Sequence, residues 1–85
     1  MTVDPASRHT LADMVMPDAV LNTLHRRLTA IECSADTLSL HLASERAQGV
    51  VEALDVLKVL KPADIEALYL AVEDAVQVRI KALML

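Results

Sequence analysis

Apolar residues recur at helical spacing over a long stretch of the chain that begins after Pro17. They follow one another at alternating intervals of three and four residues, which places them on one helix face as in a coiled-coil seam. The seam has no apolar residue at Glu45 or Gly49, and Gly49 suits the position just after a helix C-terminus. The pattern predicts a first helix over residues 17–47. The residues of the seam are Leu21, Leu24, Leu28, Ile31, Ala35, Leu38 and Leu42.

Part of this stretch also allows a strand. In TLSLHLAS, residues 37–44, Leu38, Leu40 and Leu42 alternate with polar residues. The seam passes through the segment without interruption, so we favour the helix.

Two further helices are predicted after Gly49. The segment VVEALDVLKVL, residues 50–60, is apolar around most of a helix surface. Pro62 ends this second helix and opens a third at 62–84, with Asp64 in its first turn, where the helix dipole favours acids. The third helix carries one apolar face formed by Ile65, Leu68, Tyr69, Val72, Val76, Ile80 and Leu83.

These elements predict an all-α fold built as a long helical hairpin. Helix 17–47 forms one arm, and helices 50–60 and 62–84 form a second arm that is kinked at Pro62. Residues 1–16 are expected to be a flexible N-terminal arm, and residues 17–85 a single helical domain, since 85 residues suffice for one domain. Met14 and Met16 in the arm are adaptable apolar groups that suit docking on a partner or on the helices.

The apolar content exceeds what one hairpin covers. Apolar residues make up 54% of the chain, and each predicted helix carries a second apolar stripe. We therefore predict a homodimer that resembles a four-helix bundle. A monomeric three-helix bundle, in which the second stripes face the third helix, is the alternative.

The second stripes also supply the candidate binding residues. Tyr69, the only aromatic residue, lies on the apolar face of the third helix, where we favour a core residue with its hydroxyl at the rim, and it is added to the candidates as a potential anchor. We expect a small non-enzymatic interaction module, such as an inhibitor, adaptor or chaperone-like protein, that binds another protein through an apolar helix surface. The predicted interface residues are Leu40, Val51, Val59, Tyr69, Leu70 and Val78.

Sites for chemistry are scarce in the sequence. His25 and His41 do not form the Glu-x-x-His or His-Glu-x-x-His spacings of metal-binding helices. No His or Lys lies one helical turn from Cys33, so this thiol is interpreted as a small apolar contact residue. We predict no catalytic residue, no cofactor and no metal site. A ligand- or metal-binding bundle remains an alternative function.

Charge argues against nucleic acid as a partner. Twelve acidic residues outnumber eight basic ones, and the only basic cluster is His25, Arg26 and Arg27. A small dimeric transcriptional regulator or antitoxin that uses this cluster is a further alternative. The chain has no long uncharged apolar run and no apolar leader segment, so we expect a cytoplasmic protein that does not span a membrane.

Overall fold

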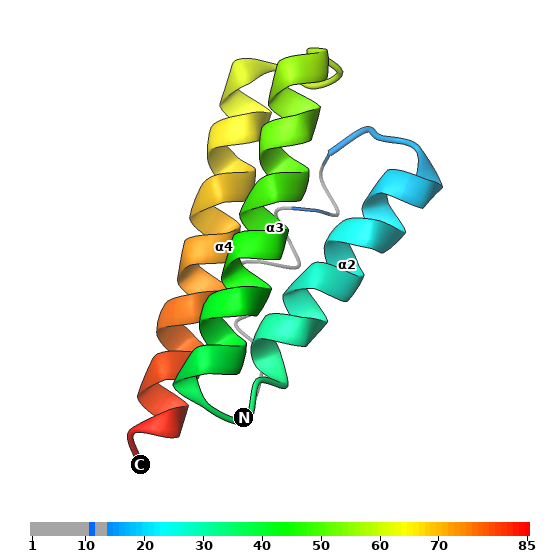
Figure 1. Cartoon of the computed structure of the whole chain (residues 1–85). Coiled ribbons are helices and arrows are strands. Elements are labelled where there is room, and N and C mark those ends of the chain that lie inside the picture. The colour runs from blue at the N-terminus through cyan, green and yellow to red at the C-terminus, as the bar shows by residue number, and fades with distance from the viewer. Residues whose placement is uncertain (1–10, 12–13) are drawn as a thin grey trace.

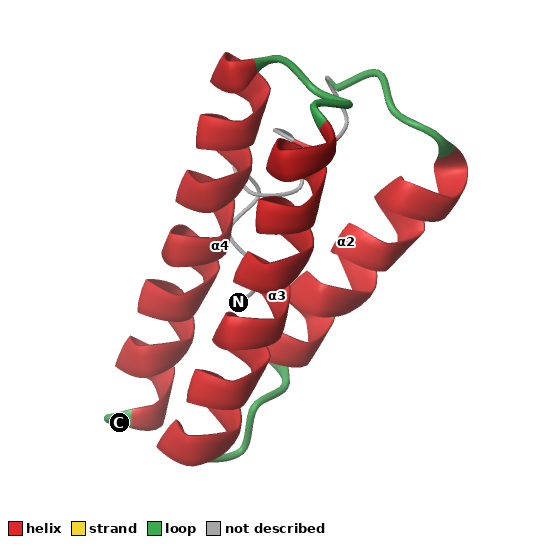
Figure 2. Cartoon of the chain, turned by 45° about the horizontal axis from the view of Figure 1, so that its top comes forward, coloured by secondary structure: helices red, strands yellow, loops and turns green. Residues whose placement is uncertain are grey.

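The computed structural model describes Leu11 and residues 14–85; residues 1–10 and 12–13 lie outside the described part. The described part contains the helices α2 (Asp18–Glu32), α3 (Thr37–Leu57) and α4 (Pro62–Leu83), and no strand. α3 and α4 lie side by side, and α2 is inclined to them and packs on both (Figure 1; Figure 2). The prediction of an all-α fold is confirmed.

The prediction of a single helix over residues 17–47 is wrong, because the helix is interrupted at residues 33–36, between the end of α2 and the start of α3. Asp36 is the N-cap of α3, and its carboxylate accepts a hydrogen bond of 2.7 Å from the backbone N–H of Ser39. Aspartate is among the strongest N-cap residues, so it begins a new helix here. The Nε of Arg79 donates to the carbonyl oxygen of Ser34 at 2.8 Å and ties the connection to α4.

The predicted helix end at Gly49 is also wrong, because α3 runs through this residue. Gly49 has no positive φ, so it does not adopt the left-handed conformation that ends many helices. Ala47 and Val51 on either side are fully buried and hold the helix against the core. Packing of these neighbours outweighs the weak helix propensity of one glycine.

α3 and α4 are joined by a tight connection at residues 58–61. Lys58 has a φ of 55°, and the N–H of Val59 donates to the carbonyl oxygen of Leu54 at 3.4 Å, the arrangement of a Schellman cap. Pro62 begins α4 as predicted, whereas the preceding helix ends at Leu57 rather than at residue 60. The segments predicted as two halves of one kinked arm are therefore antiparallel neighbours (Figure 1).

The core lies where the three helices meet, and its register on α3 differs from the predicted seam. Leu38 and Leu42 are exposed by 67% and 49%, whereas Leu40 is exposed by only 3%. The break at 33–36 changes the rotation of α3 relative to α2, so one seam cannot continue across both helices. Buried apolar residues on the helices are Leu24, Leu28, Ile31, Leu40, Ala43, Ala47, Val51, Leu54, Ile65, Leu68, Ala71, Val72 and Ala75.

Part of the predicted N-terminal arm packs on this core. Leu11 is fully buried, and Met14 and Met16 are half-buried against the core residues. At these three positions the segment belongs to the helical domain rather than to a separate arm. The rest of the predicted arm, residues 1–10 and 12–13, lies outside the described residues.

None of the helices in the described part is long and apolar enough to cross a lipid bilayer.

Candidate interaction surfaces

Two of the six predicted interface residues lie in the core. Leu40 and Val51 are exposed by 3% and 0% and pack against the other helices. They cannot touch a partner while the three helices stay packed. The sequence placed them on a second stripe because it assigned the inner face of this region to Leu38 and Leu42.

The other four predicted residues are accessible but come from different places. Val59 lies in the α3–α4 connection and is exposed by 58%. Leu70 and Val78 lie on α4 and are exposed by 58% and 39%. Tyr69 is half-buried and packs partly against the core. The structure therefore does not unite the six residues in one surface.

An apolar surface that the sequence did not predict runs along α3. Leu38, Leu42 and Val56 are exposed by 67%, 49% and 72%, on the helix face opposite the buried residues. Gly49 lies on the same face, seven residues from both Leu42 and Val56, and is also exposed. We call these four residues the outer α3 stripe. With the start of α3 at Thr37 known, the seven-residue spacing of Leu42, Gly49 and Val56 indicates that they share one helix face.

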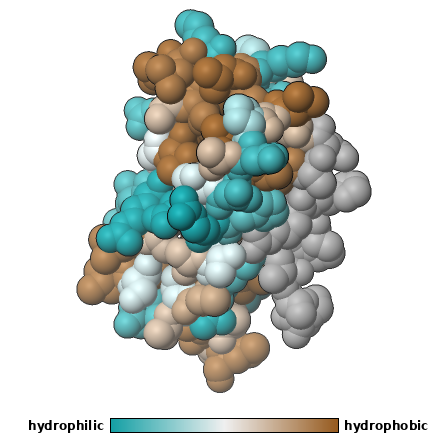
Figure 3. All heavy atoms as spheres, turned by 90° about the vertical axis from the view of Figure 1, so that its right-hand side faces the viewer, coloured by the Kyte–Doolittle hydropathy of each residue, from teal (hydrophilic) through white to brown (hydrophobic). Residues whose placement is uncertain are grey.

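The stripe continues into an apolar end of the molecule. Leu57 and Val59, exposed by 68% and 58%, follow Val56 at the end of α3. Apolar side chains gather at this end, over the α3–α4 connection (Figure 3). Lys58 and Lys61 are exposed within the same connection.

A groove lies between α3 and α4. It has a volume of about 270 Å³ and is lined by Ser44, Gln48, Tyr69, Glu73 and Val76. Ser44 is buried, and its Oγ accepts a hydrogen bond of 3.0 Å from Nε2 of Gln48. This bond holds the amide of Gln48 over the groove, beside the only aromatic ring of the chain.

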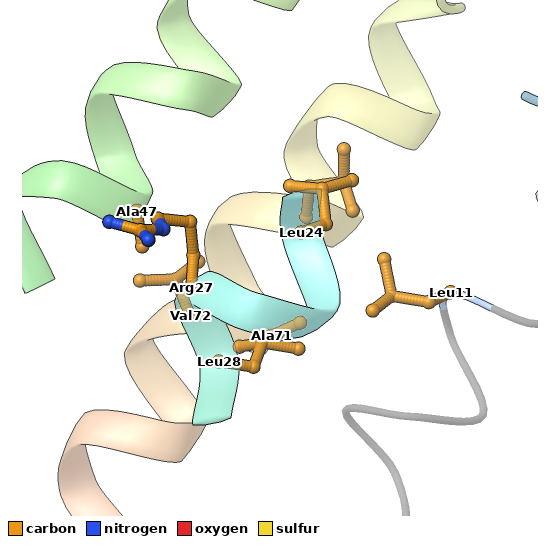
Figure 4. Close-up of a pocket in the computed structure, with 8 residues that line it drawn as sticks. Leu11, Leu24, Arg27, Leu28, Ala47, Ala71 and Val72 are labelled. Carbon is orange, nitrogen blue, oxygen red and sulfur yellow. The ribbon is translucent and has the colours of Figure 1, made fainter. Parts of the chain in front are cut away.

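A second space, between α2 and the other two helices, is too small for a ligand. Leu11 points toward α2 here, and the remaining space between Leu11, Leu24, Leu28 and Val72 is only about 10 Å³ (Figure 4). A cavity of this size holds one water molecule at most. It is a packing defect of the core.

The basic cluster that the alternative of a transcriptional regulator or antitoxin would use does not form one exposed surface. Arg26 is exposed and donates from its guanidinium to Oγ1 of Thr23 at 3.3 Å. Arg27 is half-buried and lines the small space beside Leu11. His25 is half-buried as well, so only Arg26 of the three is fully presented to solvent.

Side chains with metal-binding or nucleophilic chemistry are dispersed. Among Leu11 and residues 14–85, no group of three or more His, Cys, Asp or Glu side chains is arranged to hold a metal ion. Cys33 is an exposed free thiol at the C-terminal end of α2.

Comparison with known proteins adds no assignment: no protein-family model matches the chain, and no curated protein or solved structure matches it.

Proposed function

We propose that this chain is a non-enzymatic protein–protein interaction module that binds an amphipathic helix of another protein along the outer α3 stripe. One observation carries the proposal. Leu38, Leu42 and Val56 stay exposed on a single helix face, directly opposite the face that packs into the core. Amphipathic helices commonly bind another protein by laying their apolar face on an apolar surface, with anchors one or two helical turns apart.

The alignment of these residues distinguishes them from ordinary exposed apolar residues. Single exposed apolar side chains are normal on a protein surface. Full burial of a Leu or Val side chain is worth about 1.5–3 kcal/mol. The three side chains of the stripe contribute little of this to the folding of the isolated chain, so the corresponding free energy is available to a partner.

Gly49 supports a closely approaching helix. A Cβ at this position would meet nothing within 4 Å, so no contact inside the chain requires a glycine. Glycine in a helix interior costs about 0.5–1 kcal/mol relative to alanine. A partner helix that packs against the backbone of α3 at Gly49 would account for the residue, since small residues allow close approach of helices.

Charge disfavours an antiparallel pairing of two copies of this chain through the stripe. Glu45 and Glu52 are exposed on α3 and border the stripe on one side. Two copies packed antiparallel along their stripes would bring these carboxylates together, where like charges repel, whereas parallel copies would bring them beside exposed Arg46 on the other side of the partner's stripe. The homodimer predicted from the sequence stays a prediction, and the solution mass measured by light scattering over a wide dilution range decides it.

The proposal is tested by placing negative charges on the outer α3 stripe. The double variant Leu42→Glu/Val56→Glu places carboxylates on exposed positions, so helical circular dichroism should be retained. A partner protein that co-purifies with the unmodified chain should no longer co-purify with this variant. The matched control is Leu70→Glu, which puts the same charge on the exposed face of α4 and should leave binding intact.

Nuclear magnetic resonance (NMR) of labelled methyl groups then locates the contact. On titration with the isolated partner, methyl shifts should concentrate at Leu38, Leu42 and Val56 and spare Leu70. Loss of binding in Leu70→Glu together with full binding by the double variant would place the site on α4 and refute the proposal. Shifts confined to other methyl groups would do the same.

A further inference from the structure

The groove between α3 and α4 is lined by both apolar and polar side chains. Tyr69 and Val76 supply apolar surface from α4, and both also pack against the core. Gln48 and the buried Ser44 form the α3 wall, joined by their hydrogen bond. Such a groove has room for one side chain with a long aliphatic part.

Acidic residues line both rims of this groove. On α3, Glu45, Glu52 and Asp55 lie one or two helical turns from Gln48 and therefore on its side of the helix. On α4, Glu73 lines the groove, and Glu66 lies one turn before Tyr69. All five carboxylates are on exposed residues.

The basic residues of the two helices do not neutralise these rims. Arg46 follows Glu45 and lies on the opposite side of α3 from Gln48. Arg79 is engaged with the carbonyl oxygen of Ser34. Lys81 lies two helical turns beyond Glu73 and is rotated away from the groove. The groove therefore has negatively charged rims and apolar surface from Tyr69 and Val76.

We propose that this groove binds a cationic peptide segment of a protein, in which Lys or Arg side chains lie at helical spacing. The aliphatic stem of one such side chain packs on Val76 and on the ring of Tyr69, whose face attracts a cation. Its charged end reaches the carboxylate of Glu73, and neighbouring cations pair with Glu52 and Glu66. Nucleic acid is disfavoured, because its phosphates would meet the same carboxylates.

This site is distinct from the outer α3 stripe and does not depend on it. Glu45 and Glu52 lie between the stripe and the groove, but the stripe binds through apolar side chains of α3, whereas the groove also uses Tyr69 and Glu73 of α4. Failure of cationic peptides to bind would leave the stripe proposal untouched, and the double variant of the stripe should still bind them.

The sole aromatic residue makes the test specific. Because the chain has one Tyr and no Trp or Phe, its intrinsic fluorescence reports on Tyr69 alone. The probe is a synthetic helical peptide of Lys, Leu and Ala that contains no aromatic residue. Titration should give a saturable change in Tyr69 fluorescence, and the affinity should fall when salt is raised to about 0.15 M. A peptide with Glu in place of Lys should give no change.

Two variants test the named contacts. Removal of one exposed ion pair typically weakens an interaction by about 1.5- to 5-fold. Glu73→Gln should therefore lower peptide affinity by about this factor, and Glu52→Gln/Glu73→Gln by about tenfold. Asp18→Asn, which removes the same charge from exposed Asp18 at the start of α2, is the matched control and should have no effect.

Three results would overturn the proposal. An equal loss in Asp18→Asn and Glu73→Gln would show that only the overall negative charge attracts the peptide. Unchanged peptide affinity in the double Gln variant would show that the carboxylates of Glu52 and Glu73 do not contact the peptide. Binding seen by NMR amide shifts outside α3 and α4, with constant Tyr69 fluorescence, would place the peptide elsewhere.

Discussion

Gly49 stands in the middle of α3 although the backbone there does not need a glycine. Its φ is not positive, and a side chain at this position would extend into open space. In a helix interior, glycine loses more backbone freedom on folding than alanine does. The residue therefore lowers the stability of the isolated chain.

Replacing this glycine should stabilise the protein. Gly49→Ala should raise the free energy of unfolding by about 0.5–1 kcal/mol, measured by chemical denaturation, because alanine has the higher helix propensity. The mirror-image control is Ala53→Gly, also exposed on α3, which should lower the free energy of unfolding by a similar amount. A destabilising Gly49→Ala would show that the position is crowded in solution.

Asp36 sets the boundary between α2 and α3. The hydrogen bond from the backbone N–H of Ser39, with a smaller contribution from the Ser39 hydroxyl, lowers the pKa of the Asp36 carboxyl below its ordinary value of 3.8. A carboxyl with a lowered pKa stabilises the folded state while it is ionised. This contribution to stability is fully present at a pH above the ordinary pKa of 3.8, and it is lost as the pH falls through the lowered pKa of the folded state.

The cap therefore predicts an acid-sensitive helix start. Asp36→Ala should lower the melting temperature at neutral pH, since the backbone N–H of Ser39 in the first turn of α3 loses its charged acceptor. The difference from the unmodified chain should shrink as the pH is lowered below 3.8. Asp18→Asn, which does not alter this cap, serves as the comparison. A difference that stays constant down to the lowest pH would argue against an ionised cap.

The register of α3 separates the observed fold from the seam that the sequence suggests. Leu40→Ala should reduce the free energy of unfolding by about 2–5 kcal/mol, as expected for a buried leucine, whereas Leu38→Ala should change it by less than about 0.5 kcal/mol. Leu40 is exposed by 3% and Leu38 by 67%. Denaturant titration of the two variants measures both values. A larger loss of stability in Leu38→Ala than in Leu40→Ala would instead support the continuous seam predicted from the sequence.

The helices were predictable from the sequence to different degrees. Pro62 and the acidic turn after it predicted the start of α4, and the apolar face of Ile65, Leu68 and Val72 is buried as expected. The break before Thr37 was missed because the spacing of apolar residues continues across it by coincidence. The signal that could have found it is Asp36 three residues before Ser39, a capping arrangement that outweighs periodicity.

At the scale of the whole molecule, the N-terminal segment contributes to the core through Leu11. This residue is 1% exposed and fills the space between α2 and α4 (Figure 4). Leu11→Ala should therefore lower the free energy of unfolding by about 2–5 kcal/mol in thermal or chemical denaturation. Val15→Ala, at a position that is 95% exposed, should have almost no effect. Equal stabilities of the two variants would show that Leu11 does not dock in solution.

The binding surfaces were less predictable than the helices. Val59 and Leu70 were identified as exposed apolar residues, but Leu40 and Val51 were assigned to the wrong face. Which stripe of a helix is covered depends on where the third helix packs, and helical periodicity alone does not contain that information. The groove beside Tyr69 arises from two helices that are distant in the sequence, so no local motif marks it.

The two short connections, at residues 33–36 and 58–61, also determine how fast the chain finds its fold. Each helix packs on the one that follows it, so closing the loops between them loses little chain entropy, and folding in microseconds to milliseconds is expected. The docking of Leu11 beside Val72 joins segments that are far apart along the chain and is therefore expected to be the last event. Removing the leucine side chain should accelerate unfolding while leaving the refolding rate nearly unchanged.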